Sequence, residues 1–237
     1  MTAPTSFKYC PQCAAELAFI TRAEDGGDKT RLRCPACDYT HWNNPVPVLA
    51  AVIEYNGQIL LARNAAWPGK MYALITGFME AGETPQEGIT REIAEETSLT
   101  TDSLDLIGVY DFQRMNQVII AYHVLARGEV RLSPELAEYK LFAPADVVCW
   151  PAGTGYALAD WLRQRLGWET AEHRLEELNA MTENPDLWND PARAQKLMRE
   201  RTKLENGMNS ILSLERDVRD SVELAEMAEA EGDESLI

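Results

Sequence analysis

The sequence predicts an α+β fold that carries a small cysteine-bearing unit at its N-terminus and an all-helical segment at its C-terminus. Three observations lead to this prediction. Four cysteines fall in two close pairs within the first forty residues. Strand-like apolar runs with a few interspersed helical segments then continue to about Gly167, as in a mixed-sheet domain. Residues 169–237 contain no strand-like run. We therefore expect three parts, covering residues 1–44, 45–168 and 169–237.

Composition excludes some classes of partner. The net charge is -16, from 38 acidic and 22 basic residues, and this balance disfavours attraction to the backbone of duplex nucleic acid. The N-terminus has no signal-peptide core, and no later run approaches the roughly eighteen apolar residues of a membrane span. We expect a cytoplasmic protein without a membrane segment. The stretch from Asp220 to the end has seven acidic residues and no Lys or Arg, and forms an acidic tail.

The middle part begins after "NNPVP", a proline-punctuated connector that favours extended structure. "VLAAVIEYNGQILLAR" then alternates around a central Asn-Gly, the strongest short signal for a β-hairpin. "EGITREIAEET" has helical spacing, in which Ile89 and Ile93 mark a buried stripe. Further strands are predicted in "MYALITGF", "LDLIGVYDF", "QVIIAYHVLA" and "AEYKLFAPADV", and a second amphipathic helix in "TGYALADWLRQRLG".

The C-terminal part is predicted to be a helical hairpin or coiled coil. Asp190 is the candidate N-cap of a long helix, with Pro191 in its first turn. Apolar residues then recur every seven positions, at Leu197, Leu204, Ile211 and Val218. Such a stripe needs a partner, either the middle domain or a second copy of the chain, so a homodimer is one interpretation.

The cysteine pairs have the spacing of a metal site. Cys10, Cys13, Cys34 and Cys37 form C-x2-C-x20-C-x2-C, and four thiolates in two such pairs supply tetrahedral sulfur ligation for Zn²⁺. All four ligands come from the protein, which indicates a closed, structural site of the zinc-ribbon type. Two unrelated cysteine pairs are the alternative. Cys149 stands apart and is predicted to be a small buried residue.

The helix at 87–97 crowds three carboxylates onto one face. Glu92 and Glu96 are i,i+4 neighbours, and Glu92 and Glu95 are i,i+3 neighbours, so their charges repel and destabilise the helix by a few tenths of a kcal/mol per pair. Either basic partners or a divalent cation should offset this repulsion. A solvated acidic helix without a ligand remains the plain alternative.

The stretch from Gly77 to Leu99, "GFMEAGETPQEGITREIAEETSL", closely resembles the Nudix box: Gly, five residues, Glu, seven residues, then Arg-Glu-aliphatic-x-Glu-Glu-x-Gly-aliphatic. Every charged position matches. The chain from about residue 7 to 167 is similar to zinc-ribbon Nudix hydrolases. That resemblance implies a mixed sheet sandwiched by helices. It also implies Mg²⁺- or Mn²⁺-dependent cleavage of the pyrophosphate in a nucleoside diphosphate linked to another moiety.

The resemblance also implies residue roles. Glu92 and Glu96 would be the main Mg²⁺ ligands, and Glu95 would join them or position water. Arg91 and Glu83 would pair and brace the loop against the helix, although an ordinary surface ion pair is the alternative. Gly77 would give the chain a sharp passage from strand into loop, and Gly82 belongs to the same loop.

Two positions depart from the family pattern. Ser98 stands where the box ends in glycine, so a left-handed turn there would be strained and we expect the helix end to shift slightly. Ile75 stands where many members carry proline, which affects the shape of the loop.

The general base often comes from outside the box. Glu138 resembles a glutamate that precedes a late strand in zinc-ribbon members, and an exposed loop acid is the alternative. His123 is predicted to be a sheet residue.

The sequence identifies the substrate less closely than it identifies the catalytic residues. A zinc ribbon ahead of a Nudix domain resembles NADH pyrophosphatases and a related group that acts on ADP-ribose or FAD. The stretch after the box lacks the "SQPWPFP"-like segment of the former, while "WNNPVPV" and "YKLF" resemble segments of the latter. ADP-ribose or FAD is therefore the main prediction, and NADH or NAD-capped RNA the alternative. Tyr110 and Phe112 could stack an adenine, but core positions are an equally good interpretation.

Residues from about 172 to 237, including "LWNDPARAQKLMRER", resemble the N-terminal helical domain of bacterial peptide chain release factor 2. These residues contain no codon-reading or Gly-Gly-Gln segment, so we do not expect the tail to terminate translation by itself. We interpret it as some kind of fusion without a catalytic role. A non-enzymatic adaptor that keeps the Nudix fold is the competing function, and association with the ribosome is a weaker hypothesis.

Overall fold

The computed structural model describes residues 7–67, 69 and 71–231, without the side chains of Glu169, Asp186, Val218 and residues 221–231. The chain forms two compact units, Met1–Pro45 and Val46–Ile237. Each unit has its own sheet. Within the described part of the chain, no helix is both long and apolar enough to cross a membrane.

The first unit is a small antiparallel sheet in the order β1-β2-β3, formed by Ala18–Glu24, Gly27–Arg33 and Thr40–His41. Gly26 and Gly27 take positive φ angles in the turn between the first two strands, a conformation that glycine adopts at no steric cost. Among the described residues of this unit, the buried apolar cluster consists of Cys10, Leu17, Leu32 and Cys34. So small a core rarely stabilises a fold alone, which makes a structural metal valuable here.

The second unit is built on a six-stranded mixed sheet. Its order is β7-β8-β4-β5-β9, and β6 pairs with β4 beside this path. Among the described strands of this sheet, β4 and β8 form the one parallel pair, and the other pairs are antiparallel. The strands are β4 Val46–Tyr55, β5 Gln58–Asn64, β6 Ile75–Phe78, β7 Thr100–Phe112, β8 Gln117–Arg127 and β9 Leu136–Phe142. The predicted hairpin is confirmed, since Asn56 and Gly57 both take the positive φ of a tight hairpin turn between β4 and β5.

Helices cover both faces of this sheet. Side chains alternate along β4, so Leu49, Ala51 and Ile53 pack with Ile89 and Ile93 of α1, Pro85–Thr97. The intervening Ala50 packs with Ala157, and Val52 with Leu158 and Leu162, all from α2, Thr154–Leu166. Both faces are therefore buried, which explains why β4 reads as a continuous apolar run. The predicted α+β sandwich is confirmed.

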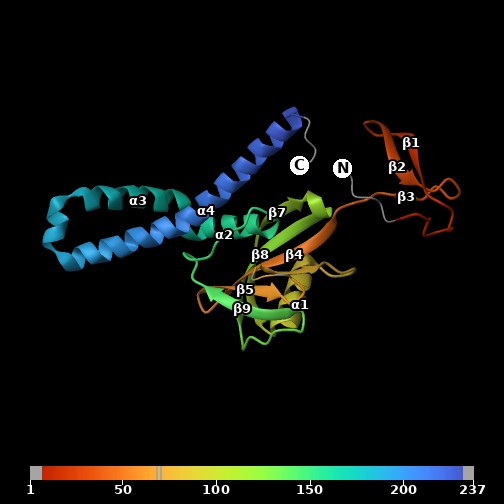
Figure 1. The fold of residues 1–237 in the computed structure, drawn as a ribbon. Coiled ribbons are helices and arrows are strands. Elements are labelled where there is room, and N and C mark those ends of the chain that lie inside the picture. The colour runs from red at the N-terminus through yellow and green to blue at the C-terminus, as the bar shows by residue number, and fades with distance from the viewer. Residues whose placement is uncertain (1–6, 68, 70, 232–237) are drawn as a thin grey trace. The chain divides into compact units, whose positions relative to one another are not determined.

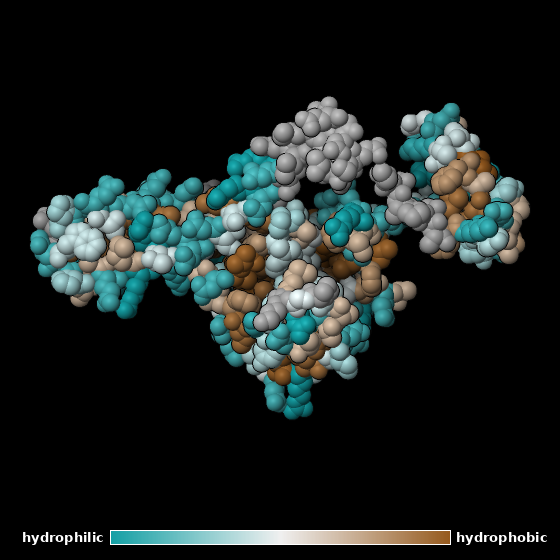
Figure 2. Space-filling model, viewed as in Figure 1, coloured by the Kyte–Doolittle hydropathy of each residue, from teal (hydrophilic) through white to brown (hydrophobic). Residues whose placement is uncertain are grey.

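The C-terminal part is helical, as predicted. It contains α3, Trp168–Glu183, and α4, Pro191–Glu231; two short 3-10 helices lie at Gln113–Met115 and Pro185–Asn189. α3 and the first part of α4 run side by side as a hairpin (Figure 1), whose visible side is mostly hydrophilic (Figure 2). The N–H of Arg193 donates to Asp190 Oδ1 at 3.1 Å, so Asp190 is the predicted N-cap.

Part of the apolar stripe of α4 packs against α2 of the same unit. Ile211 and Leu214 are buried in the same apolar cluster as Leu158 and Leu162 of α2. The Ser210 hydroxyl donates to the carbonyl of Val147 at 2.8 Å, which anchors the helix beside the end of the sheet domain. The heptad prediction holds in part, because Leu197 and Leu204 are only half-buried, whereas Ile211 is fully buried. The side chain of Val218 and the end of the acidic tail lie outside the described residues.

Candidate active site

The acidic helix α1 begins with a complete capping box. The Thr84 hydroxyl accepts from the N–H of Glu87, and the Glu87 carboxylate accepts from the N–H of Thr84 at 2.8 Å. Pro85 occupies the first turn, where a missing N–H costs nothing. Ile89 and Ile93 are fully buried against the sheet, and Glu92, Glu95 and Glu96 on the same helix line a cavity.

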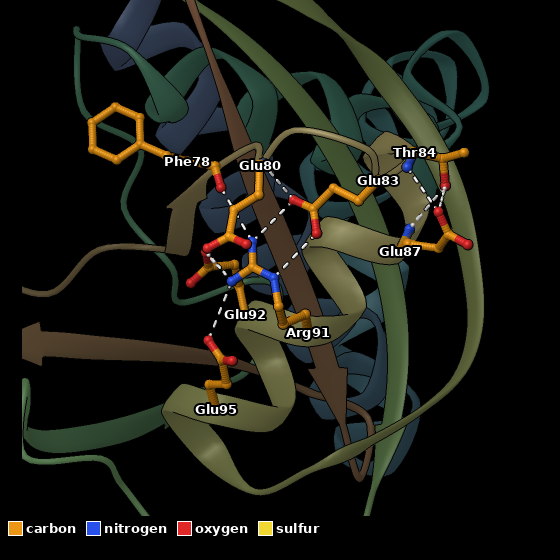
Figure 3. A network of polar contacts seen from close by, with 8 residues as sticks. All are labelled: Phe78, Glu80, Glu83, Thr84, Glu87, Arg91, Glu92 and Glu95. Atoms are coloured by element: carbon orange, nitrogen blue, oxygen red, sulfur yellow. Dashed lines mark hydrogen bonds and ion pairs between the residues drawn. The ribbon is translucent and has the colours of Figure 1, made fainter.

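Arg91 is the basic partner that offsets part of the repulsion on this helix. Its guanidinium donates to both carboxylate oxygens of Glu83, at 3.0 and 3.1 Å, so the predicted pair is present and bidentate. It also donates to Glu92 at 2.8 Å, to Glu95 at 3.2 Å and to the carbonyl of Phe78 at 3.2 Å (Figure 3). One cation thus ties the helix, the preceding loop and the end of β6 together.

The glycines around this network are needed for close approach. A Cβ on Gly77 would lie 1.9 Å from the carboxylate carbon of Glu92, so only glycine lets that carboxylate lie against β6. The predicted sharp turn at Gly77 is wrong, because the residue lies inside β6 and has no positive φ. Gly82 does lie in the loop, with φ of 92°. Glycine is needed at position 88 for a similar reason, since a Cβ there would lie 2.5 Å from Glu83 Oε1.

An open cavity of about 530 Å³ lies in front of these carboxylates. Its acidic wall includes Glu80, Glu92, Glu95, Glu96 and Glu135. Burial, together with the charges of Glu92, Glu135 and Glu95, raises the pKa of Glu96 to about 7, and burial also raises the pKa of Glu92. So much negative charge at the mouth of a cavity favours a cation there.

Glu135 was missed by the sequence analysis, which singled out Glu138 instead. Glu138 lies opposite Arg63 in the pairing of β9 with β5 and bonds its Nε at 2.9 Å. The hydroxyl of Tyr72 and this guanidinium hold the pKa of Glu138 below its ordinary value. The residues that line the cavity include Glu135 and not Glu138. The predicted base is therefore engaged elsewhere.

Tyr110 and Phe112 do not line the cavity either. Both pack on the α2 side of the sheet, in the cluster that contains Ile119 and Ala157, and the Tyr110 hydroxyl donates to Asp160 at 2.9 Å. The structure thus favours the core interpretation of these two aromatic residues over the predicted adenine stacking. The aromatic residues that do line the cavity are Trp67 and Phe78, which the sequence analysis did not single out.

The departure at Ser98 is accommodated without the predicted shift of the helix end. Ser98 takes φ 60° and ψ 13°, the left-handed conformation that glycine would favour, and its N–H bonds the carbonyl of Ala94. Its hydroxyl donates to the carbonyl of Arg131 at 3.1 Å. The helix therefore ends as a glycine-capped helix would, and a side-chain hydrogen bond compensates part of the strain.

Two residues outside the cavity have the structural roles predicted for them. His123 lies within β8, 3.1 Å from a carboxylate oxygen of Glu54, and packs on Trp161. Cys149 is buried, and burial raises the pKa of its thiol to about 11, which makes it unreactive.

The four N-terminal cysteines form a preorganised metal site. Their Sγ atoms lie within 4.8 Å of one another, with Cys10 and Cys37 3.5 Å apart and Cys13 and Cys34 3.4 Å apart. Tetrahedral zinc with Zn–S bonds of 2.3 Å needs sulfur atoms about 3.8 Å apart, so the cluster fits zinc. Burial opposes ionisation of Cys34, yet the N–H groups of Ala36 and Cys37 lower the pKa of its thiol to about 7. The thiolate form that zinc requires is thus favoured at Cys34. At Cys37 the N–H of Tyr39 lowers the pKa, but burial and the other three thiols together raise it to about 12, so the cluster does not ionise fully without a cation.

The carboxylates are arranged differently. Within the described residues, the cysteines are the only set of three or more potential metal ligands whose donor atoms converge on one point. Glu92 instead pairs with Arg91, and the exposed Glu95 shares the same guanidinium. The carboxylate oxygens suit a hard cation such as Mg²⁺ in chemical type, and they line a cavity that leaves room for a ligand.

Family models divide the chain into three matches. A model of the NUDIX domain matches residues 44–164, just over half of the chain. A model described as Nudix N-terminal, a zinc ribbon, matches residues 8–43, and one of the PCRF domain matches residues 171–237.

Relatives agree with this division. Peptide chain release factor 2 from Ruegeria sp. (strain TM1040) is 54% identical over 78 residues, which are 33% of this chain and 21% of that protein. The NAD-capped RNA hydrolase NudC from Vibrio parahaemolyticus is 27% identical over 117 residues, 49% of this chain and 43% of that protein. The chain thus spans about a fifth of the release factors and less than half of the NudC protein that it matches.

A solved NUDIX hydrolase from Nitrosomonas europaea superposes on this chain with a TM-score of 0.53 at 29% identity. The superposition covers 60% of this chain and 80% of the hydrolase chain. The sheet-and-helix sandwich, the Arg91 network and the NUDIX match over more than half of the residues agree with one another. The chain belongs to the NUDIX domain family, with a Nudix N-terminal zinc ribbon before that domain and a PCRF domain after it.

Proposed function

We propose that the protein is a Nudix pyrophosphohydrolase that cleaves a nucleoside diphosphate linked to another moiety, with Mg²⁺ or Mn²⁺ as the catalytic cation and ADP-ribose or FAD as substrate. The observation that carries this proposal is the acidic wall of the cavity. Glu92, Glu95 and Glu96 line the same open cavity. Glu92 lies so close to β6 that only glycine fits at position 77.

In this proposal Glu92 and Glu96 hold the cation, and Glu95 joins them or positions water. A bound Mg²⁺ would neutralise the pyrophosphate and lower the pKa of an attacking water. Arg91 and Glu83 keep the helix and loop in position. Water adds to one phosphorus, the bridging P–O bond breaks, and two phosphate monoesters leave. The proton of the water passes to a carboxylate that acts as general base.

We propose Glu135 as this base in preference to Glu138. Glu135 lines the cavity, and its charge contributes to the raised pKa of Glu96, whereas Glu138 is bonded to Arg63. The two glutamates lie three residues apart and provide a matched pair. Glu135→Gln is expected to lower kcat about 100-fold, and Glu138→Gln to leave it within about twofold. The reverse pattern would restore Glu138 as the base.

NAD-capped RNA or NADH is the second candidate substrate, because the relative from Vibrio parahaemolyticus carries the name NAD-capped RNA hydrolase. The reaction on the pyrophosphate would be the same, and the difference lies in what the rest of the cavity accepts.

A non-enzymatic adaptor, with ribosome association through the PCRF segment, is a weaker candidate that rests on the likeness to release factor 2. Co-sedimentation of the full chain with ribosomes would support it. Deletion of residues 169–237 is a poor test, because it would remove Ile211 and Leu214 from the core beside α2.

The deciding experiment measures phosphate release, coupled to a phosphatase, with Mg²⁺ across ADP-ribose, FAD, NADH, NAD and NAD-capped RNA. The proposal expects turnover of ADP-ribose or FAD that disappears without a divalent cation. Preference for NADH or capped RNA would favour the second candidate. No turnover on any member of the panel, with the fold intact, would contradict enzymatic function and favour the adaptor.

A further inference from the structure

We propose that Ser133 is a positioning residue for the hydrolysis, because its N–H and its hydroxyl bond it to the backbones of both Glu96 and Glu135. This inference rests on the proposed function, in which Glu96 holds the cation and Glu135 is the general base. It assigns a role to a residue that lies outside the stretch resembling the Nudix box and that does not line the cavity.

The loop between β8 and β9 is bonded to the end of helix α1. The last carbonyls of a helix have no partner within the helix and need one from elsewhere. The N–H of Arg131 donates to the carbonyl of Thr97 at 2.8 Å. The N–H of Ser133 donates to the carbonyl of Glu96 at 2.9 Å. The helix residue that would hold the cation is therefore also a point of attachment for this loop.

A tight turn follows, and the residue types suit it. The turn runs from Ser133 to Leu136, and the N–H of Leu136 closes it by donating to the carbonyl of Ser133 at 3.1 Å. Serine is favoured at the first position of such a turn, and proline, here Pro134, at the second, where its ring fixes φ. The Ser133 hydroxyl accepts from the N–H of Glu135 at 3.3 Å, a bond that serine can make to the backbone two residues on.

Glu135 is also held from its other side. Its carbonyl accepts from the N–H of Ala65 at 2.8 Å, just after β5 ends. Both main-chain polar groups of Glu135 are therefore hydrogen-bonded, whereas its side chain is exposed and lines the cavity. The backbone is fixed while the carboxylate stays accessible to a water molecule.

The two attachments meet at Ser133. Its N–H leads to Glu96 and its hydroxyl to Glu135, so one residue relates the backbone of the cation-binding helix to that of the base. The hydroxyl makes only the second of these bonds, so its removal should loosen the base without detaching the loop from α1. Misplacement of a catalytic group by about 1 Å can lower a rate about 100-fold, so even partial loosening should be measurable.

The test compares Ser133→Ala, Glu135→Gln and the double variant on the substrate that the wild type hydrolyses with Mg²⁺. Ser133→Ala should lower kcat about tenfold and leave KM within about twofold, since the hydroxyl positions the base and does not bind substrate. Ser133→Thr keeps the acceptor oxygen and should restore kcat to within about twofold of the wild type. In the Glu135→Gln background, Ser133→Ala should cost less than about twofold further, because the carboxylate that it positions is gone.

The matched control is Ser98→Gly. It removes another hydroxyl bond to the same loop, the one to the carbonyl of Arg131, and should keep kcat within about twofold of the wild type. An equal loss in Ser98→Gly and Ser133→Ala would overturn the role of Ser133, because attachment of the loop in general would then explain both. Additive losses in the double variant, or no rescue by Ser133→Thr, would overturn it as well.

The same set of variants separates this inference from the proposed function. An inactive wild type would contradict the hydrolase, and a fully active Glu135→Gln would contradict the base; either result removes the role of Ser133 too. A loss of about 100-fold in Glu135→Gln with full activity in Ser133→Ala would contradict the positioning role alone. Hydrogen exchange of the Glu135 amide, measured without turnover, should be faster in Ser133→Ala than in the wild type, and unchanged exchange would also overturn the inference.

Discussion

The two clusters of potential metal ligands in this chain differ in how far the protein has organised them. In the zinc ribbon, four thiols converge within 4.8 Å, and N–H groups of the neighbouring backbone donate to the sulfurs of Cys10 and Cys34. On α1, the carboxylates do not converge on one point, and the Arg91 guanidinium donates hydrogen bonds to two of them, those of Glu92 and Glu95. The first cluster is ready for its ion, and the second must rearrange to accept one.

This difference matches two different uses of a metal. A structural ion supplies folding free energy, so its ligands should be closed around it and inaccessible to substrate. A catalytic cation must keep positions open for water and phosphate, so an incomplete set of ligands in an open cavity is suitable. The predictions below sharpen or break this comparison.

The largest effect is expected from loss of a thiolate in the ribbon. Cys34→Ser should abolish stoichiometric zinc binding and unfold the first unit, because its remaining buried core is very small. Zinc content by atomic absorption and amide exchange of residues 18–33 provide the measurement. Cys149→Ser is the matched control, since this buried cysteine lies outside the cluster and its loss should leave zinc content unchanged. Full zinc retention in Cys34→Ser would contradict the four-thiolate site.

The next largest effect concerns the carboxylate cluster. Gly77→Ala should lower kcat about 100-fold or more, because its Cβ would lie 1.9 Å from the carboxylate carbon of Glu92 and displace it. The double-mutant cycle with Glu92→Ala isolates this cause. In the Glu92→Ala background the added methyl group should cost little further activity, since the carboxylate that it would displace is gone. Additive losses would show that Gly77 acts through something else.

A moderate effect should appear in the pH dependence of the Mg²⁺-free protein. The pKa of folded Glu96 is raised from 4.5 to about 7, so the native state binds this proton more tightly than the unfolded chain does. The corresponding stability is present below about pH 4.5 and is lost as the pH rises toward 7. Urea midpoints between pH 5 and 8 should therefore fall in the wild type relative to Glu96→Gln, and Mg²⁺ should reduce the difference. Parallel profiles would contradict the shift.

The smallest effect is expected at the end of α1. Ser98→Gly removes the strain of a left-handed serine but also removes the hydrogen bond to Arg131, so the free energy of unfolding should change by less than about 1 kcal/mol. Denaturant titration measures it, and activity should remain. A loss above about 2 kcal/mol would mean that the Ser98 hydroxyl does more than offset strain.

Local sequence signals predicted much of this structure because each is satisfied within a few residues. Asn56-Gly57 makes the hairpin, Asp190 caps α4, and the two cysteine pairs meet as their spacing implies. The Arg91–Glu83 pair also followed from a resemblance confined to one loop and one helix.

Features that depend on pairing between distant strands were not predictable. The face that Tyr110 and Phe112 share is set by pairing with β8, and a register shift between Leu106 and Gly108 intervenes in that pairing. Glu138 is occupied because β9 aligns it with Arg63 of β5, and this alignment leaves Glu135 at the cavity. Sequence patterns specify the spacing of side chains along a strand, but not the strand that lies beside it.

The packing of α4 illustrates the same limit. The heptad pattern indicated that the helix needs a partner, but not that Ile211 would complete the core beside α2. Only the folded arrangement shows that α2 covers this part of the apolar stripe.

The measurement that tests the central claim most directly is the kcat of Glu96→Gln on the preferred substrate of the panel, with zinc content and melting temperature recorded on the same sample. Catalysis through a carboxylate-bound cation predicts a loss on the order of 100- to 1,000-fold, with one zinc per chain and an unchanged or higher melting temperature. A variant that keeps wild-type turnover with Mg²⁺ would contradict the claim that the crowded carboxylates of α1 form the catalytic site.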